Sequence, residues 1–147
     1  MEKYIVKVIL VTRATHDVLR IVVEKPALYT FIPGQATEVA INKRGWEEIK
    51  RPFTFTSLPD DTHLEMIIKT YASHAGVTNE FLKLKPGDEL LIHDAWGAIS
   101  YEGEGVFIAG GAGITPFLSI LRNLKRQNKV SGNRLIFANN TTADIIQ

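Results

Sequence analysis

The segment RPFTFTS, residues 51–57, carries a guanidinium, two aromatic rings and three hydroxyl groups within seven residues. That is more chemistry than a barrel strand needs, although an ordinary strand would also fit, with Phe53 and Phe55 in a core and Arg51 at a solvated edge. The segment AGVTN, residues 75–79, places a glycine before a short expected helix. Its simpler interpretation is a capped helix that closes one end of a barrel. Together the two segments favour one ligand that contains both a phosphate and a flat ring.

The segment GGAGITP, residues 110–116, is a glycine-rich turn between an expected strand and an expected helix. Such a turn brings backbone N–H groups and a helix N-terminus against a pyrophosphate. Pro116 stands where the usual dinucleotide fingerprint has its third glycine. The strand before the turn and the amphipathic helix after it supply the context that the motif requires. These residues therefore predict a dinucleotide phosphate site.

The chain before residue 95 supplies the elements that must hold the first two segments. Two β-branched and aromatic runs between Tyr4 and Val23, separated by RATHD, predict a pair of antiparallel strands. In the run HLEMIIKTY, Leu64, Met66 and Ile68 fall on one face. Further features are a turn at Pro33–Gly34, strands within 37–41, 51–57, 63–71 and 88–94, and a polar hairpin loop at 42–50. About six strands of this kind predict a small antiparallel barrel.

A short helix is expected between the last two of these strands. Thr78 is a suitable N-cap, and Glu80 suits the first turn. Pro86 and Gly87 would end the segment. This helix is expected to plug one end of the barrel.

From residue 103 the pattern changes to that of an α/β unit. The apolar run GVFIAGG is typical of a parallel strand covered on both faces, and RLIFANN is the next expected strand. Thr115 is expected to cap the intervening helix, with Pro116 at its first position. The apolar face of that helix comprises Phe117, Ile120, Leu121 and Leu124. We therefore expect a barrel domain at residues 1–102 and the start of a parallel-sheet domain at residues 103–147.

Composition excludes several kinds of chemistry. The 147 residues include no cysteine, which removes disulfides, thiolate metal sites, iron–sulfur ligation and cysteine nucleophiles. Any redox chemistry must therefore come from a bound cofactor. The net charge of +1 argues against nucleic acid or an anionic membrane as a partner. No metal site is expected, because the four histidines are scattered in the sequence: His16, His63, His74 and His93.

The segments RPFTFTS, AGVTN and GGAGITP, in this order and at these separations, resemble the ferredoxin–NADP reductase family. The segment DAWGAI, residues 94–99, is similar to flavodoxin-reductase-like members of that family. The resemblance covers essentially the whole chain. It implies a six-stranded FAD-binding barrel followed by an NAD(P)-binding domain. It also implies an oxidoreductase that passes hydride from NAD(P)H to FAD and electrons to a separate acceptor, either a protein or a small molecule.

The resemblance implies roles for individual residues of the barrel. Arg51 would grip the flavin pyrophosphate, Phe53 would stack on the isoalloxazine ring, and Thr54 would hydrogen-bond near flavin N5. A rigid guanidinium fork suits phosphate, an aromatic face suits a planar ring, and a short hydroxyl can approach N5 without covering the hydride path. The other flavin-binding positions implied are Lys69, Tyr71, Gly76, Val77 and Thr78.

In the second domain, the resemblance implies that Thr115 faces the flavin while Gly111 and Gly113 admit the nicotinamide dinucleotide. Thr54 and Thr115 are thus the two expected catalytic residues. The sequence also departs from the family pattern. Phe53 stands where tyrosine is common, so a phenolic hydrogen bond to the ribityl chain is missing, and Ala75 stands where many relatives have glycine.

The two ends of the chain lead to further expectations. The apolar run at the N-terminus is interrupted by Lys7, is too short to span a bilayer and has no cleavage signal, so a cytoplasmic protein is expected. Near the C-terminus, Thr141 and Asp144 form a helix-start signal, yet the family's later cysteine–glycine segment has no counterpart before Gln147. The chain is therefore expected to be a fragment or to depend on another chain. By itself it is expected to bind FAD well but to turn over NAD(P)H poorly or not at all. A homodimer through the incomplete α/β part is one expected outcome.

Two other functions fit the sequence. The chain could be a non-catalytic flavin-binding subunit for electron transfer or interaction within a larger assembly. A riboflavin-synthase-like barrel is the third interpretation, but it leaves GGAGITP unexplained. The sequence leaves NADH and NADPH open, because residues that read the 2′-phosphate would lie at or beyond 139–141. The choice of FAD over FMN depends on the resemblance, and the acceptor is not identified.

Overall fold

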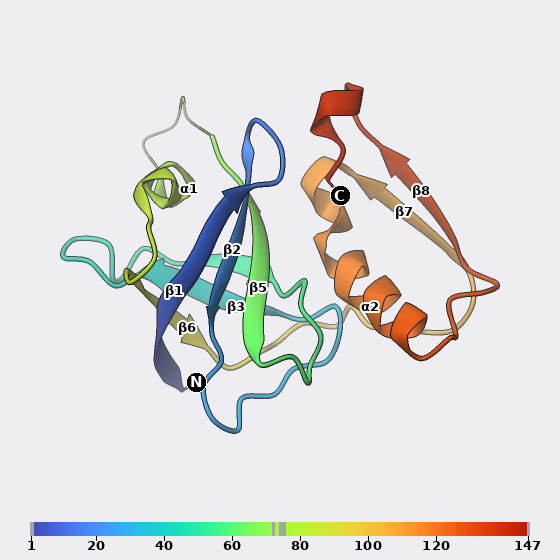
Figure 1. Cartoon of the computed structure of the whole chain (residues 1–147), viewed down its shortest axis with the longest axis horizontal. Coiled ribbons are helices and arrows are strands. Elements are labelled where there is room, and N and C mark those ends of the chain that lie inside the picture. The colour runs from blue at the N-terminus through green and yellow to red at the C-terminus, as the bar shows by residue number, and fades with distance from the viewer. Residues whose placement is uncertain (1, 72, 74–75, 147) are drawn as a thin grey trace.

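The computed structural model of the chain describes residues 2–71, 73 and 76–146. These residues form a six-stranded antiparallel sheet and a two-stranded parallel sheet. Figure 1 shows the first sheet curled on one side of the molecule, with helix α2 and the second sheet on the other. The predicted fold class, a barrel followed by the opening of an α/β unit, is confirmed. His74 and Ala75 lie outside the described residues.

The barrel strands lie in the order β4-β3-β6-β1-β2-β5, and every neighbouring pair is antiparallel. They are β1 (Lys3–Arg13), β2 (Val18–Glu24), β3 (Ala36–Ile41), β4 (Arg51–Thr54), β5 (His63–Lys69) and β6 (Glu89–His93). The first half of β1, residues 3–7, pairs with β6, and the second half pairs with β2. A register shift between Val8 and Leu10 lies at this changeover. Such an irregularity bends a strand, which helps the sheet to curl.

Strands β4 and β5 are the two edges of the sheet, and an isolated bridge between Phe55 and Met66 joins them. Beside the bridge, the amide of Thr56 donates to the carbonyl of Glu65 at 2.9 Å. The barrel therefore closes just after β4 ends. Within the described residues, β4 itself pairs on one side, with β3, and its other edge is free.

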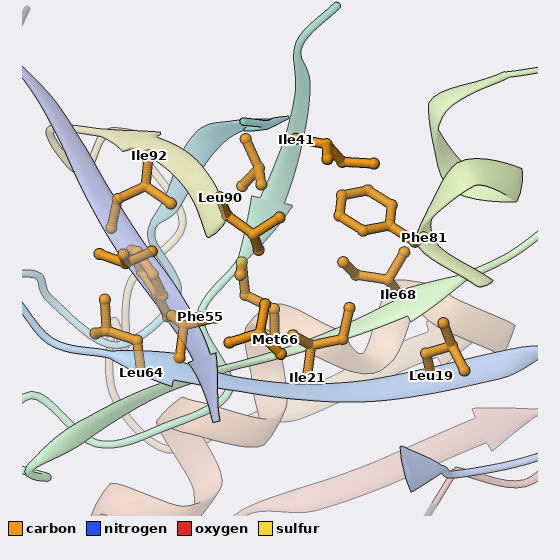
Figure 2. Close-up of a cluster of buried hydrophobic side chains, with 14 of the residues drawn as sticks. Leu19, Ile21, Ile41, Phe55, Leu64, Met66, Ile68, Phe81, Leu90 and Ile92 are labelled. Carbon is orange, nitrogen blue, oxygen red and sulfur yellow. The ribbon is translucent and has the colours of Figure 1, made fainter. Parts of the chain in front are cut away.

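Side chains from the strands converge in the barrel interior, as Figure 2 shows. In β5, Leu64, Met66 and Ile68 are all buried, as expected from their alternation. The residues between them on the other face, Glu65 and Ile67, are buried as well. Strand β5 therefore has a second covered face, which lies against the α/β part of the chain.

Helix α1 (Val77–Glu80) and the 3-10 turn Phe81–Lys83 close one end of the barrel, as predicted. The expected cap is wrong. Gly76, in an extended conformation, occupies the N-cap position, and no side chain caps the helix. Thr78 is already the second helical residue, so its hydroxyl is past the position from which it could cap.

The second sheet pairs β7 (Val106–Gly110) with β8 (Arg134–Ala138) in parallel. A 3-10 turn, Gly111–Ile114, leads from β7 into helix α2 (Thr115–Arg126). The prediction that Thr115 caps this helix is wrong. Ile114, the last residue of the turn, already has helical backbone angles, so Thr115 becomes the first helical residue. An N-cap needs an extended backbone, which the turn does not provide.

After β8, the chain forms a 3-10 turn at Thr142–Asp144. Thr141 and Asp144 make the reciprocal capping box that their spacing predicts. The Asp144 carboxylate accepts from the Thr141 amide at 3.0 Å and from its hydroxyl at 2.8 Å. This arrangement fixes the Asp144 carboxylate close to the carboxyl end of β8.

Helix α2 lies between the barrel and the second sheet (Figure 1) and is covered on two faces. Ser119 and Arg122 donate to backbone carbonyls of the barrel. On the other face, the ring of Phe117 meets Phe107 of β7 edge-on, with centroids 5.1 Å apart. The predicted apolar stripe therefore describes only part of the buried surface, and Ser119 is fully buried outside it.

Several apolar side chains of the second sheet remain exposed. Val106, Ile108 and Ile136 are 58%, 71% and 50% exposed, respectively. Exposure of this kind agrees with strands that lack their usual neighbours. The homodimer stays a prediction. In the described part of the chain, no helix is long and apolar enough to cross a membrane.

Replacement of Phe55 tests how far the barrel depends on its closing point. Phe55 is fully buried, and its ring lies 4.7 Å from that of Phe31 and 5.8 Å from that of Tyr29. We expect Phe55→Ala to lower the free energy of unfolding by about 3–5 kcal/mol, because a cavity remains. Leu28→Ala is the control, since Leu28 is 98% exposed and its truncation should change stability by less than about 0.5 kcal/mol. Urea unfolding measures both, and equal midpoints would contradict the assignment.

Candidate functional site

A cleft of about 650 Å³ lies between the barrel and the second sheet. Its barrel wall comes from the β1–β2 hairpin and the end of β5, and its other wall comes from the carboxyl ends of β7 and β8. Ligands of open α/β sheets bind outside the carboxyl ends of the strands. The lining residues are His16, Asp17, Val18, Lys69, Gly110, Gly111, Ala112, Ala138, Asn139, Asn140, Thr141, Asp144 and Ile146. Among the predicted site residues, Lys69 and Gly111 are thus brought together.

The glycine turn presents open backbone to this cleft. A Cβ atom added at Gly110, Gly111 or Gly113 would meet no atom within 4 Å. Gly111 has a φ of +52°, a left-handed conformation that favours glycine. Nothing in the described chain therefore covers the turn at these points, and a phosphate could approach its backbone. This is the arrangement that the dinucleotide prediction requires.

Asn139 offers an unused acceptor at the end of β8. Its Oδ1 atom is buried and has no hydrogen-bond partner in the described chain. A buried polar atom without a partner costs about 1–3 kcal/mol, so such atoms call for a donor from elsewhere. Asn139 lines the cleft, so rotation of its side chain toward the cleft would let a ligand N–H or O–H group supply that donor. The residues present thus fit a polar, hydrogen-bonding ligand such as a nucleotide.

Charged groups line both walls of the cleft. Lys69 Nζ lies 3.9 Å from an Asp17 carboxylate oxygen, and His16 Nε2 lies 3.3 Å from Asp144 Oδ1. A hydrogen bond from Thr141 lowers the pKa of Asp144, and the nearby charges of His16 and Lys69 act in the same direction. Asp144 therefore presents a carboxylate at neutral pH.

Potential ligand atoms of His16, Asp17 and Asp144 lie within 4.8 Å of one another. Asp144 is far from His16 and Asp17 in the sequence, so the spacing of the histidines does not reveal this grouping. The side chain of His16 is 60% exposed, and solvated groups of this kind often gather without a metal. The expectation of no metal site stays a prediction.

The predicted flavin-binding residues Arg51, Phe53 and Thr54 lie in β4, an edge strand that pairs only with β3 within the described residues. Arg51 is exposed, and its Nη1 donates to the Lys50 carbonyl at 2.7 Å; no carboxylate in the described chain pairs with it. Phe53 is half-buried and meets Phe81 edge-on, with centroids 5.5 Å apart. Thr54 is half-buried, and no described group hydrogen-bonds to its hydroxyl. A free cation, a partly covered ring and an unused hydroxyl fit the chemistry of a flavin nucleotide.

The plug-helix residues contribute in different ways. Val77 is 1% exposed and belongs to the barrel core, so its backbone alone could meet a ligand. Gly76 borders open space, since a Cβ added there would meet nothing within 4 Å. The contact of Phe53 with Phe81 brings β4 next to this helix. Arg51 to Thr54 and Gly76 to Thr78 thus belong to adjoining elements.

The remaining predicted residues fall in two places, Lys69 and Tyr71 around the end of β5 and Gly113 and Thr115 around the start of α2. Lys69 Nζ sits 5.7 Å from the centre of the Tyr71 ring, and Tyr71 is 46% exposed. Thr115 is 8% exposed at the start of α2 and, like Gly113, is outside the lining of the large cleft. Lys69 therefore shares the cleft lining with Gly111, whereas Gly113 and Thr115 do not line the cleft.

A polar junction that sequence reasoning missed joins the barrel to α2. Glu65, 8% exposed, accepts from Thr56 Oγ1 at 2.6 Å, Arg20 Nε at 2.7 Å and Arg122 Nη1 at 2.7 Å. Burial would raise the pKa of Glu65, but the hydrogen bonds from Thr56 and Arg122 and the two arginine charges outweigh it, and the pKa is lowered. The available signal was a single carboxylate inside the apolar run LEMIIK.

Comparison with known families gives the class of protein. Residues 3–103 match the FAD-binding domain family, and residues 107–147 match the oxidoreductase NAD-binding domain family. The chain belongs to the ferredoxin–NADP reductase-like family of FAD- and NAD(P)-binding oxidoreductases. The resemblance of the three sequence motifs is thereby confirmed.

Two curated relatives illustrate the range of the family. The chain is 31% identical over 134 residues to the reductase component of propane 2-monooxygenase from Rhodococcus jostii, covering 86% of this chain and 35% of the relative. It is 32% identical over 146 residues to NADH–cytochrome b5 reductase 1 from Arabidopsis thaliana, covering 90% of this chain and 50% of the relative. The chain thus spans half or less of the length of these relatives.

Solved structures share the fold. The ferredoxin NADP⁺ reductase of Neisseria gonorrhoeae, determined with bound FAD and NADP, superposes with a TM-score of 0.86 at 24% identity. The match covers 99% of this chain and 61% of that chain. A ferredoxin reductase of carbazole 1,9a-dioxygenase gives a TM-score of 0.85 at 22% identity. At these identities the comparison shows the fold alone.

Proposed function

We propose that this chain is the flavin-binding barrel and the opening of the dinucleotide-binding half of an NAD(P)H oxidoreductase. In contrast to the poor turnover expected from the sequence, we further propose that the chain can itself support hydride transfer, because both parts contribute to one cleft. When bound, FAD would take two electrons and a proton as hydride from NAD(P)H and release the electrons to a separate acceptor. The chain's own residues would bind and orient the two nucleotides. No side chain has to act as a strong acid or base.

One observation carries the proposal: a single cleft has a barrel strand on one wall and the glycine turn on the other. Lys69 at the end of β5 and Gly111 after β7 line it together. Hydride transfer requires the two reacting rings to be held in contact, so a site shared by both parts is the arrangement the reaction needs. The free Arg51, the half-buried Phe53 and the unused Thr54 hydroxyl support the flavin part.

The visible absorbance of bound flavin distinguishes this function from the alternatives. The purified chain should be yellow with FAD, and its absorbance should bleach when NADH or NADPH is added without oxygen. A yellow chain that does not bleach would favour the non-catalytic flavin-binding subunit. A chain that stays colourless after incubation with FAD would contradict both.

Arg51→Ala should weaken FAD binding. Loss of a charge-assisted hydrogen bond to phosphate costs about 1.5–3 kcal/mol, which corresponds to roughly tenfold or more in dissociation constant. Arg44→Ala is the matched control, because Arg44 is an exposed cation in the β3–β4 hairpin that the proposal leaves unused. Titration of FAD into the apo chain measures both affinities. Equal weakening by the two variants would remove Arg51 from the site.

Thr54→Val should leave FAD bound and slow its reduction by the dinucleotide. Valine keeps the shape and removes the hydroxyl, so a hydrogen bond worth about 0.5–1.5 kcal/mol is lost, or roughly two- to tenfold in rate. Stopped-flow reduction at equal flavin occupancy measures the effect. Thr62→Val, at an exposed loop position, should reduce at the parent rate. An unchanged rate for Thr54→Val would take Thr54 out of the mechanism.

The chain should prefer NADH to NADPH. An acidic residue beyond the second strand of a dinucleotide-binding unit accepts from the ribose 2′-hydroxyl and repels a 2′-phosphate. Asp144 follows β8 and lies in the cleft as a carboxylate. The name of the Arabidopsis relative also specifies NADH.

Asp144→Asn tests this preference while leaving an oxygen that can accept from Thr141. It should reduce the ratio of NADPH to NADH dissociation constants by about tenfold or more, since hydrogen bonds to charged groups contribute about 1.5–3 kcal/mol. Glu48→Gln removes an exposed carboxylate of the β3–β4 loop, outside the cleft lining, and should leave both affinities unchanged. Calorimetric titration with each dinucleotide gives the ratio. A parent chain that binds NADPH more tightly would overturn the assignment.

A further inference from the structure

We propose that Glu65 and Arg122 form a positioning pair. The pair fixes helix α2, and with it the glycine turn, against the barrel segment that follows β4. The distance and orientation between the two nucleotide-binding parts would then be set by this pair. The proposal rests on the proposed function for its catalytic consequence. Its structural consequence can be measured without any cofactor.

The contacts of Glu65 cross the junction at one point. Its Oε1 atom accepts from Arg122 Nη1 of α2 at 2.7 Å and from Thr56 Oγ1 of the barrel at 2.6 Å. The same Nη1 atom also donates to the Thr56 carbonyl at 2.7 Å. One turn earlier in α2, the fully buried Ser119 donates to the Ser57 carbonyl at 2.6 Å. Two attachment points on one helix face restrict both the sliding and the rotation of α2.

Both ends of this junction lead directly to predicted catalytic residues. Thr56 follows Thr54 by two residues, on the segment where Phe55 closes the barrel. On α2, Arg122 lies seven residues after Thr115, which places both on one face of the helix. Glu65 therefore connects the segment after β4 to α2, the helix that follows the glycine turn. A shift of this contact would move the two sites relative to each other.

In the described part of the chain, two other polar contacts join the two parts, and both are exposed to solvent: Arg126 of α2 donates to Asp60, and His16 lies 3.3 Å from Asp144. Exposed ion pairs of this kind contribute little.

The remaining contacts are apolar. Val18 and Ile67 of the barrel pack with Ala109, Ile114 and Ile146 in a second apolar cluster. Apolar contact holds surfaces together without fixing their register, because it is nearly independent of orientation. The ion pair of Glu65 with Arg122, in contrast, has a buried carboxylate and a partly exposed guanidinium. Burying a charge in a pair adds little net stability, and the best-established use of such a pair is to fix a register. The apolar cluster therefore attaches the α/β part to the barrel, and the pair of Glu65 and Arg122 sets its alignment.

Arg20 provides an internal control. It pairs with the other carboxylate oxygen of Glu65, Nε to Oε2 at 2.7 Å. Arg20 lies on β2, so this ion pair stays within the barrel, whereas that of Arg122 crosses the junction. The two arginines have similar side-chain exposure, 40% and 39%. Removing either leaves the same carboxylate with one arginine, and only the removal of Arg122 takes away a contact with α2.

The first measurement is the distance distribution between two spin labels. Because the chain has no cysteine, Lys7→Cys on β1 and Lys125→Cys on α2 introduce unique labelling sites at exposed positions. Pulsed EPR should give one narrow distance in the full chain. Arg122→Gln should broaden or shift it, Arg20→Gln should leave it unchanged, and Arg122→Lys should restore most of it, because an ammonium can donate to both barrel acceptors. Equal effects of Arg20→Gln and Arg122→Gln, or no effect of either, would overturn the proposal.

The second measurement is anaerobic reduction of bound FAD at saturating NADH. Misplacement of reacting groups by about 1 Å can cost on the order of 100-fold, so Arg122→Gln should slow the reduction step by about ten- to 100-fold. Its FAD dissociation constant should remain at the parent value, as should both quantities in Arg20→Gln. Reduction by Arg122→Gln at the parent rate would contradict the positioning role. If the parent chain does not reduce FAD, the proposed function fails, and the label distances still decide whether the pair aligns α2.

Discussion

Strand β5 has no face left for solvent, and the arrangement of the chain depends on this constraint. Leu64, Met66 and Ile68 fill the barrel, while Glu65 and Ile67 face the α/β part. Among these residues, Glu65 imposes the strongest requirement, because burying its charged carboxylate is strongly unfavourable unless hydrogen-bond donors surround it. Donors from β2, from the segment after β4 and from α2 meet there. Helix α2 is therefore held at a defined position on the barrel.

The position of α2 in turn creates the cleft. With α2 docked on β5, the carboxyl ends of β7 and β8 come to lie beside the β1–β2 hairpin. The glycine turn keeps open backbone at that edge, and Asn139 keeps an unused acceptor. Groups left without partners inside a folded chain are unusual, because most buried polar atoms are paired. Their presence beside a cleft of about 650 Å³ suits a polar ligand that completes the site.

The residues predicted to bind flavin, Arg51, Phe53 and Thr54, lie on β4. This strand has one unpaired edge and is fixed at its carboxyl end. Closure between Phe55 and Met66 anchors the chain immediately after Thr54. Ahead of that point, Arg51, Phe53 and Thr54 keep a cation, a ring and a hydroxyl that the rest of the barrel leaves unused. Groups that are held by rigid elements while remaining available are what cofactor binding needs, since little ordering remains to be done on binding.

The sequence by itself determined the elements and the class of protein. The β-branched alternation gave the strands, the glycine turn with its flanking strand and helix gave the α/β opening, and three ordered motifs gave the family. These signals are local, because strand period, turn chemistry and motif spacing are written in neighbouring residues.

Local reasoning failed at the helix starts, where Thr78 and Thr115 suit a cap by residue type but the backbone enters each helix one or two residues earlier. Only the tertiary structure decided that Glu65 meets Arg122, 57 residues away, and that His16 and Asn139 share one cleft. Such contacts depend on how one layer docks on another, and no periodicity along the chain encodes which distant polar groups will satisfy each other once water is removed.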